Sequence, residues 1–335
     1  MSYISIERLE ALLSGIDGAR VALIGDFCLD VYWTADMKQS ELSRETPHFP
    51  LPVVSERYSP GGAGNVACNV MALKPSRFIA LGAVGEDWRG EMLIRALSDA
   101  HVDCGRLVRS PELVTNTYIK PLRTGISHVV YEDPRIDFEN RSPMSEALNV
   151  RMLAALAAAE DEFDVLLVSD QMKYGCISPQ LRQRISQMGQ AGKTVIVDSR
   201  DHIADYRHVI VKPNEVEAAR AFGGGEGLAL ETLKTLVCRI AVQNAAPAII
   251  TVGDQGCLVY DQGETVHVPA RRVPPPIDIV GAGDTFLAAL GCAVAGGATL
   301  CDAARLAAMA SSITIKKIGT TGTASRDELR EAARV

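Results

Sequence analysis

Short apolar runs alternate along the chain with stretches whose apolar residues recur every three or four positions. Residues 21–24 (VALI) and 165–168 (VLLV) are apolar throughout, as in strands that are buried on both faces. The same pattern predicts further strands at 78–81, 194–197, 209–211 and 248–252, and helices at 65–73, 88–100, 179–188, 215–222 and 230–242. Apolar strands separated by amphipathic helices predict an α/β fold with a central, mostly parallel sheet flanked by helices.

Two segments depart from this alternation. Residues 31–58 are rich in proline and lack a helical period, and residues 115–138 contain extended stretches around Thr124-Gly125. Both predict antiparallel strands that project from the α/β body as a small β-sheet lid over a site, with ordinary surface hairpins as the alternative. We find no internal repeat and no low-complexity linker, so residues 1–335 are expected to form one domain.

Composition narrows the possible partners. The formal net charge is −7 and there is no basic tail, which argues against nucleic acid. The segment MSYISIERLEALLSG lacks the apolar core of a signal peptide, and the apolar runs fall short of the roughly 20 residues of a membrane span. The eight cysteines include no CxxC pair, which predicts reduced thiols instead of disulfides or a zinc site. We therefore expect a cytoplasmic protein that acts on small molecules.

Two glycine motifs suggest nucleotide binding but lack the required context. Residues 192–194 read GKT, yet Gln187 occupies the position where a phosphate-binding loop needs glycine, so an ordinary helix–strand turn is expected. Residues 62–67 fit GxGxxA, with Glu86 and Asp87 at a suitable distance for a dinucleotide fold. The residues before this motif do not end the first strand of a βαβ unit. A dehydrogenase therefore remains only an alternative.

The segment DIVGAGDTF, residues 278–286, places an aspartate between glycines and the start of a buried helix. Backbone amides at Gly281, Ala282 and Gly283 would point toward an anion at the positive end of that helix. The alternative is a glycine turn that Asp284 merely caps. A carboxylate beside an anion site is useful when it accepts a proton from a hydroxyl that attacks a phosphorus atom. The segment therefore predicts a phosphoryl-transfer unit.

This segment resembles the C-terminal signature of the ribokinase-like (PfkB) family of sugar kinases. Four other motifs agree in order: Gly25-Asp26 with Asp30, the glycine signature at 59–67, NxxE within 212–217, and TxGxxG at 251–256. The resemblance covers nearly the whole chain. It implies a ribokinase-like fold, Mg²⁺ with ATP, a sugar or sugar phosphate as acceptor, and a homodimer formed through the lid.

The resemblance also implies residue roles. Asp284 would be the general base, and the amides of Gly281, Ala282 and Gly283 would form the anion hole. The positions that match sugar-binding residues are Asp30, Gly61, Gly62, Asn65 and Asp170. An ionised carboxylate such as that of Asp30 can accept hydrogen bonds from two sugar hydroxyls.

The nucleotide end of the site is implied in the same way. The matching positions are Asn214, Glu217, Thr251, Gly253 and Gly256. Asn214 and Glu217 would organise Mg²⁺ and the phosphates, although Glu217 alone could equally be a solvated helix residue. The surroundings of Asp278 resemble a monovalent-cation site, which would suit K⁺.

Within the family, several stretches resemble heptose 7-phosphate kinases, including the kinase half of bifunctional ADP-heptose synthesis proteins. They are GDFCLDVYW at 25–33, the segment 43–54, the segment 168–175, IDFE at 136–139 and KIGT at 317–320. This resemblance implies conversion of heptose 7-phosphate to heptose 1,7-bisphosphate. Other members phosphorylate ribose, fructose or keto-sugar acids, and a catalytically silent sugar- or nucleotide-binding regulator is a further alternative.

The chain departs from the heptose-kinase pattern at several positions, and Lys173 lies one position away from the lysine of the SDYxKG pattern. His48 replaces a usual glutamate, Arg200 falls within DSR in place of DPK, and Ala308 replaces a common asparagine. An altered polar group in a site can change sugar choice, because an unpaired buried polar group costs ~1–3 kcal/mol. The cations considered for a sugar phosphate are Arg44, Lys120, Arg123 and Arg135, each of which is more typically a solvated surface charge.

Overall fold

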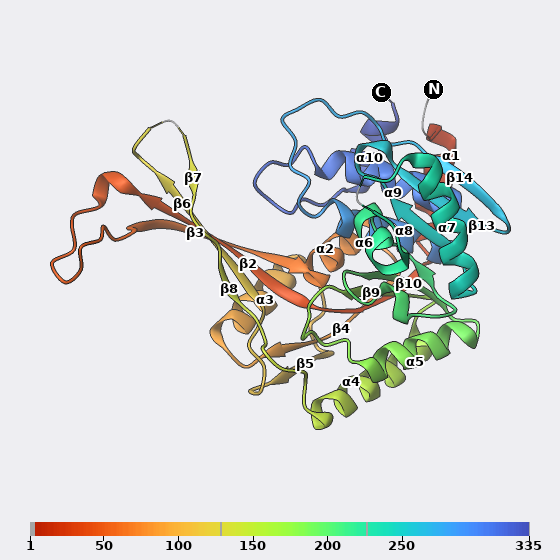
Figure 1. The fold of residues 1–335 in the computed structure, drawn as a ribbon, viewed down its shortest axis with the longest axis horizontal. Coiled ribbons are helices and arrows are strands. Elements are labelled where there is room, and N and C mark those ends of the chain that lie inside the picture. The colour runs from red at the N-terminus through yellow and green to blue at the C-terminus, as the bar shows by residue number, and fades with distance from the viewer. Residues whose placement is uncertain (1–3, 128, 226, 335) are drawn as a thin grey trace.

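The computed structural model describes residues 4–127, 129–225 and 227–334. A large sheet between two layers of helices forms the body of the molecule, and a second, smaller sheet extends outward from it (Figure 1). Residue 128, which belongs to the predicted lid segment, lies outside the described residues. The α/β architecture predicted from the apolar pattern is confirmed.

The large sheet has nine strands in the order β14-β13-β12-β11-β10-β9-β1-β4-β5. Their bounds are β1 Arg20–Gly25, β4 Arg77–Gly85, β5 Leu107–Ser110, β9 Val165–Asp170, β10 Thr194–Ser199, β11 Ile210–Val211, β12 Ala248–Thr251, β13 Cys257–Asp261 and β14 Glu264–Val268. All pairings are parallel except β12 with β13 and β13 with β14. The antiparallel hairpin at one edge was not predicted from the sequence.

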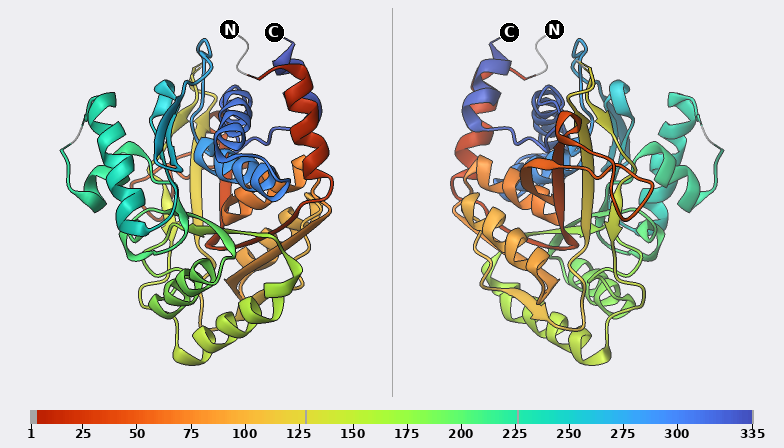
Figure 2. Two further views of the ribbon diagram at one scale, coloured as in Figure 1. Left: turned by 90° about the vertical axis from the view of Figure 1, so that its right-hand side faces the viewer. Right: turned by 90° about the vertical axis from the view of Figure 1, so that its left-hand side faces the viewer.

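Helices cover both faces of this sheet (Figure 2). One layer contains α1 Ile6–Ile16, α2 Ala63–Leu73, α3 Trp88–Asp99, α8 Ala282–Ala295, α9 Leu300–Thr314 and α10 Arg326–Ala333. The other contains α4 Glu146–Ala159, α5 Pro179–Gln190, α6 Glu215–Phe222 and α7 Leu230–Asn244. Along β1, Val21 and Leu23 pack against the first layer, whereas Ala22 and Ile24 pack against the second. This alternation explains why residues 21–24 of the strand are all apolar.

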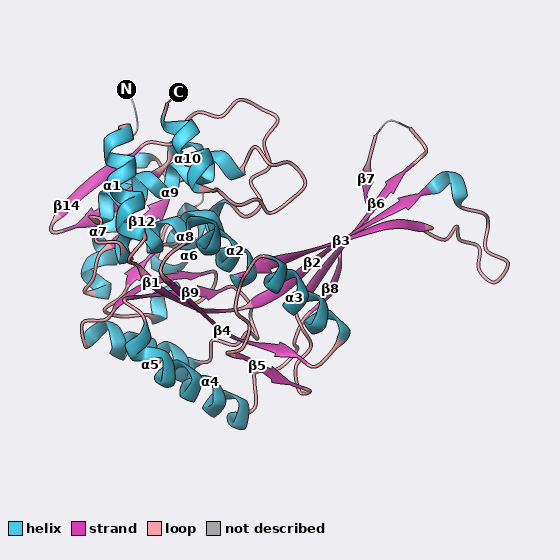
Figure 3. Cartoon of the chain, turned by 180° about the vertical axis from the view of Figure 1, so that it is seen from behind, coloured by secondary structure: helices cyan, strands magenta, loops and turns pink. Residues whose placement is uncertain are grey.

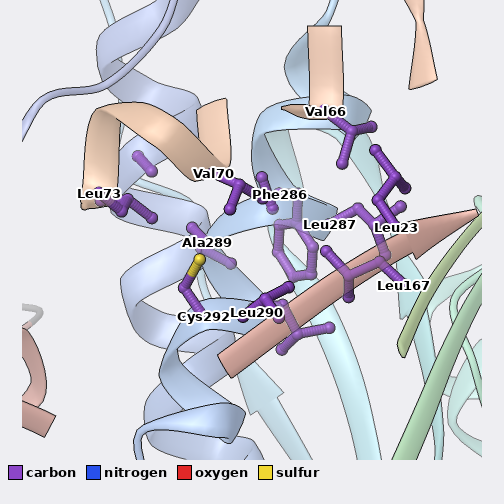
Figure 4. Packing of buried hydrophobic residues seen from close by; sticks show 14 of the residues in the cluster. Leu23, Val66, Val70, Leu73, Leu167, Phe286, Leu287, Ala289, Leu290 and Cys292 are labelled. Carbon is purple, nitrogen blue, oxygen red and sulfur yellow. The ribbon is translucent and has the colours of Figure 1, made fainter. Parts of the chain in front are cut away.

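Helix α8 lies deep in the first layer. Figure 4 shows Phe286, Leu287 and Leu290 packed among side chains of α2 and of the central strands, including Val66 and Leu167. At Gly291 an added Cβ would lie 2.3 Å from a Leu167 methyl carbon. Helix α8 can therefore approach β9 this closely only because residue 291 has no side chain. The N-terminus of α8 is therefore held by a closely packed core.

The smaller sheet, called here the projecting sheet, contains β2 Phe27–Asp36, β3 Val53–Gly62, β6 Thr117–Thr124, β7 Tyr131–Glu132 and β8 Ile136–Phe138. Its strands fan away from the body (Figure 3). β2 pairs antiparallel with β3 but parallel with β6. The projection was predicted, but β2 begins earlier and β3 ends later than the predicted segment 31–58. These two strands therefore run back into the body, where β3 leads directly into α2.

Other sequence predictions can be compared directly. The predicted strands and helices are all present, with small shifts at their ends, whereas α1, α4, α9, α10 and β5 were not predicted. The GKT segment is a helix–strand turn between α5 and β10, with Gly192 at a φ of 93°. The GxGxxA motif follows an antiparallel strand, β3, and so lacks the βαβ context of a dinucleotide fold.

The structure also bears on the predictions about cysteines and membrane-spanning segments. All eight cysteines carry free thiols, and burial raises the pKa of Cys68, Cys257 and Cys292 to about 12. Over the part of the chain that the structure describes, no helix combines the length and apolar character needed to cross a bilayer.

Candidate active site

The site is organised around the first turn of α8. Gly281 is the N-cap, with a φ of 80°, and no side chain among the described residues caps the helix. An added Cβ at Gly281 would lie 2.6 Å from the Asn65 side-chain nitrogen, and Gly283 faces open space. The Ala282 N–H already donates to the Ile279 carbonyl at 3.2 Å. Glycine at both positions keeps the positive end of the helix accessible to an anion.

Asp284 is the third residue of this helix and does not cap it. Its carboxylate accepts a hydrogen bond from Asn65 Nδ2 at 2.8 Å. Removal from water raises the pKa of Asp284 to about 7, with Asp198 and Asp30 adding to the rise and Asn65 and Lys212 opposing it. A half-buried carboxylate with a pKa near neutrality can accept a proton and release it again. The capping alternative is therefore wrong for this residue.

A buried ion pair beside Asp284 was not anticipated from the sequence. Lys212 Nζ lies 3.0 Å from Asp198 Oδ2, and both side chains are buried. Burial opposes the charge on Lys212, but Asp198 and Glu217 outweigh it and raise its pKa. The available signal was positional, since Asp198 lies near the carboxyl end of β10 and Lys212 directly follows β11. Parallel neighbouring strands bring such positions together at one sheet edge.

The NxxE residues form a capping box at the start of α6. Asn214 Oδ1 accepts from the Glu217 N–H at 2.8 Å, and Glu217 Oε2 accepts from the Asn214 N–H at 2.9 Å. Glu217 is half-buried, and burial together with Asp198 raises its pKa. It is therefore not a freely solvated helix residue. Among the described residues, no cluster of three or more His, Cys, Asp or Glu side chains is arranged to bind a metal ion.

The remaining nucleotide-side positions lie at the turn between β12 and β13. Asn214 and Thr251 form a bridge that brings the NxxE motif next to the TxGxxG motif. Gly253 and Gly256 both have positive φ. A Cβ at Gly256 would lie 2.1 Å from the Val268 carbonyl oxygen, whereas Gly253 faces open space. The fold itself therefore requires glycine at 256.

On the opposite side of the site, Asp30 of β2 faces the glycine signature. An added Cβ at Gly61 would lie 2.8 Å from Asp30 Oδ2, and one at Gly62 would lie 2.6 Å from the Asp26 carbonyl oxygen. Burial raises the pKa of Asp30, while nearby Lys120 and Arg135 oppose the rise. The glycines thus leave room for the carboxylate where β3 passes β2.

Asp170 and Asp26 occupy buried positions behind this surface. Asp170 Oδ2 accepts from Tyr206 at 2.9 Å, from Ser199 at 3.0 Å and from Arg182 at 3.3 Å. The structure thus places the predicted substrate residue Asp170 in an internal network. Asp26 accepts three backbone N–H bonds from residues 171, 172 and 176, and burial raises its pKa to about 6. It therefore fixes the loop that follows β9.

Asp278 links two loops next to α8. Its carboxylate accepts from the Val280 N–H at 3.0 Å and from the Gly319 N–H at 2.9 Å. Its own N–H donates to the Ile315 carbonyl. Because both carboxylate oxygens already accept backbone bonds, the side chain shapes these loops, and the role of their carbonyls as cation ligands stays a prediction.

A pocket of about 370 Å³ opens between the projecting sheet and the loops after β9 and β10. It is lined by Asn116, Tyr118, Asp137, Glu139, Asn140, Arg141, Gln171, Met172, Lys173, Tyr174, Arg200 and Asp201. Tyr118 is the register partner of Asp30 on the neighbouring strand, so the pocket adjoins that carboxylate. Sequence reasoning named Arg200 only as a departure and did not predict the pocket.

The other departures and candidate cations lie elsewhere. His48 is exposed in the loop between β2 and β3, and Ala308 is half-buried on α9. Arg123 pairs with Asp133 at 2.5 Å, and Arg135 pairs with Asp137 at 2.6 Å. Lys120 donates to the Tyr32 hydroxyl and Arg44 is exposed.

Comparison with known proteins agrees with this geometry. The family model described as pfkB family carbohydrate kinase matches residues 20–327. The bifunctional protein HldE of Caulobacter sp. (strain K31) is 36% identical over 327 residues, which cover 94% of this chain and 63% of the relative. This chain therefore spans less than two thirds of the length of that relative.

Two solved structures share the fold. Arabidopsis thaliana ribokinase complexed with ribose and ATP aligns with a TM-score of 0.70 at 20% identity, covering 95% of this chain and 99% of the ribokinase. Escherichia coli phosphofructokinase-2 in complex with fructose-6-phosphate aligns with a TM-score of 0.71 at 21% identity, covering 95% and 98%.

Proposed function

Because the chain belongs to the pfkB family of carbohydrate kinases, we propose that it transfers the γ-phosphate of ATP to heptose 7-phosphate and yields heptose 1,7-bisphosphate. The observation that carries the kinase chemistry is the position of Asp284, half-buried beside the open N-terminus of α8 and hydrogen-bonded to Asn65. The similarity to HldE proteins and the local heptose-kinase motifs support the substrate.

In the proposed reaction the acceptor hydroxyl lies against Asp284. The carboxylate takes the hydroxyl proton while the oxygen bonds to the γ-phosphorus and the bond to the ADP oxygen breaks. The N-terminal amides of α8 would stabilise the negative charge on the transferred group. Lys212, held by Asp198, keeps a positive charge near Asp284 that lowers the pKa of this carboxyl, whereas Asp198 raises it.

The acceptor would be oriented by Asp30, with Asn65 shared between sugar and base. Asp30 projects from the sheet opposite Gly61, and its carboxylate can accept bonds from two hydroxyls. We include movement of the projecting sheet as a lid in this proposal, because closure would exclude water and limit ATP hydrolysis.

Mg²⁺ suits the residues at the nucleotide end. Asn214 and Glu217, which the capping box holds together, would supply side-chain oxygens to the metal or its waters, since Mg²⁺ typically keeps several waters and substrate phosphates in its shell. A metal held there with ATP would neutralise phosphate charge. Thr251, Gly253 and Gly256 would line the nucleotide side.

The proposal also includes binding of a monovalent cation near Asp278 and a homodimer formed through the projecting sheet. Escherichia coli phosphofructokinase-2 has been crystallised in complex with potassium and in a tetrameric form. In this chain the carbonyls around Asp278 are the candidate ligands for K⁺. The tip of the projecting sheet exposes Leu42, Phe49 and Val54, which would suit a homodimer formed through that sheet.

The test is ADP release with Mg-ATP and a panel of heptose 7-phosphate, ribose, fructose and fructose 6-phosphate, followed by ³¹P NMR of the product. Selective turnover of heptose 7-phosphate at its anomeric hydroxyl is expected. Selective turnover of another sugar would overturn the substrate but retain the kinase. ATP binding without turnover of any sugar would favour the regulator alternative.

A further inference from the structure

The pocket between the projecting sheet and the loops after β9 and β10 has an unusual balance of charges. Two of its three carboxylates are paired with an arginine, and the third accepts a hydrogen bond from a neutral hydroxyl. Asp137 pairs with Arg135 at 2.6 Å, and Asp201 pairs with Arg220 at 3.1 Å. Glu139 accepts a hydrogen bond from the Tyr118 hydroxyl at 3.0 Å.

The cations of the same pocket are not engaged in this way. Arg141, Lys173 and Arg200 line it from three separate segments of the chain. Within the described ranges, no carboxylate forms an ion pair with any of the three. Lys173 contacts the Tyr174 ring, with Nζ at 5.2 Å from the ring centroid. The Tyr118 hydroxyl is neutral, so Glu139 keeps its negative charge. Three cations without a carboxylate partner among the described residues, against this one carboxylate, leave the pocket with an excess of positive charge.

Arg200 also connects the pocket with the reacting centre. Its charge lowers the pKa of both Cys28 and Glu217, against the larger effect of burial in each case. Cys28 lies two residues before Asp30 on β2. Arg200 lines the pocket that adjoins Asp30, and its charge also acts on Glu217 of the NxxE motif.

The loop that carries Lys173 is held in place by hydrogen bonds to the buried Asp26. Asp26 accepts the backbone N–H groups of Gln171 and Met172 at 2.9 and 2.8 Å, and Met172 in turn contacts the Tyr118 hydroxyl. Because the loop is already ordered, placing Lys173 against a ligand would cost little conformational entropy on binding.

We propose that this pocket binds the phosphate group that the acceptor sugar already carries, with Arg141, Lys173 and Arg200 as its ligands. This inference rests on the proposed kinase function and makes it more specific. A phosphate monoester has acceptor oxygens that suit guanidinium and ammonium donors. The sugar ring would lie at Asp30, with the reacting hydroxyl toward Asp284 and the phosphate in the pocket.

The first experiment measures equilibrium binding to the full chain by calorimetry in the absence of ATP. Heptose 7-phosphate is compared with the same heptose without phosphate. The phosphate is expected to tighten binding by about 10-fold or more, and Arg200→Gln or Lys173→Gln is expected to remove most of that gain. Arg95→Gln, an exposed charge on α3 outside the pocket, is the control and should retain it.

Two further pairs of ligands test the same inference in case the protein prefers a sugar other than heptose. Fructose 6-phosphate against fructose, and ribose 5-phosphate against ribose, are measured with the same variants. Absence of a phosphate preference in all three pairs would overturn the inference, and so would a preference that survives in both pocket variants. Inorganic phosphate should weaken the binding of the preferred sugar phosphate, and failure to compete would contradict the proposed ligand.

Turnover separates this inference from the kinase proposal. If ADP release fails with every sugar while the phosphate preference is present, the kinase proposal fails and the pocket assignment stands. If the pocket variants raise the KM for ATP and leave the binding of sugar phosphate unchanged, Arg200 and Lys173 serve the nucleotide and the assignment is wrong.

Discussion

Asp284 and Asp30 face the same space from regions with opposite surroundings. Asp284 is carried by α8, whose following residues are buried against α2 and the central strands (Figure 4). Asp30 is carried by β2, whose base lies in the body and whose far end extends toward solvent (Figure 1). The packed region positions the group that must act on a proton. In the proposed function the projecting region moves relative to it and encloses the acceptor.

The largest effect is expected from removing the base in the packed region. Asp284→Asn should lower kcat by about 10²–10⁴-fold, because the amide cannot accept the hydroxyl proton. The amide oxygen can still accept from Asn65, so the fold should persist. Asp99→Asn, an exposed residue at the end of α3, is the matched control. Wild-type-like kcat in the Asp284 variant, measured by ADP release, would refute its role as the base.

A substitution on the buried side of α8 should lower the stability of the fold. Gly291→Val would place a Cβ 2.3 Å from the Leu167 side chain, and overpacking of this kind costs about 1–3 kcal/mol. Urea denaturation should show the loss as a lower midpoint. Gly225→Val, at a glycine with no atom near its Cβ position, is the control. Equal midpoints for both variants would show that the contact between α8 and β9 is loosely packed.

The pH dependence should report the environment of Asp284. Below its pKa of about 7 the carboxylate is protonated, so kcat/KM should fall about 10-fold per pH unit. The stability effect has the opposite direction. Between about pH 4 and 7 the folded state keeps a proton that the unfolded state has lost, so this group's contribution to stability falls as pH rises.

Asp284→Asn isolates this effect. The variant should have a higher Tm than the wild type at pH 8 and a smaller difference at pH 4. A wild-type Tm that matches the variant's at both pH values would show that burial does not raise the pKa of Asp284.

The smallest effect on stability is expected at the tip of the projecting sheet. Phe49→Ser should change the free energy of unfolding by less than about 0.5 kcal/mol, because Phe49 is 60% exposed. The same variant should weaken the proposed dimer, as measured by sedimentation velocity. Tyr206→Ser, which removes a fully buried ring, is the contrasting control and should destabilise strongly. A large loss of stability in Phe49→Ser would show that the tip packs on the body.

Sequence reasoning succeeded where a few consecutive residues carry the information. The strands could be predicted because burial on both faces makes successive residues apolar, as at residues 21–24 of β1. Asp284 could be singled out because glycines at 281 and 283 lie at the start of a buried helix, and that geometry is local to one turn. The projecting sheet could be located because its proline-rich and extended segments lack a helical period, but the ends of β2 and β3 depend on contacts with the body.

Other features depend on residues that are distant in the sequence. The pairing of Lys212 with Asp198 arises because β10 and β11 are parallel neighbours, and periodicity does not specify which strands are adjacent. Asp170 and Asp278 look like free carboxylates in the sequence, and only the folded chain shows that each already accepts hydrogen bonds. The same holds for Glu217, whose side chain closes a capping box with Asn214.

The sequence by itself therefore determined the α/β class, the family motifs and the candidate acid–base residue, because propensity, burial and glycine geometry act over short distances. Only the tertiary structure decided which charges remain unpaired. Arg141, Lys173 and Arg200 come from three segments, and their shared pocket exists only after the projecting sheet and two strand ends have met. Charge balance is a property of neighbours in space, and that is the physical reason the sequence could not supply it.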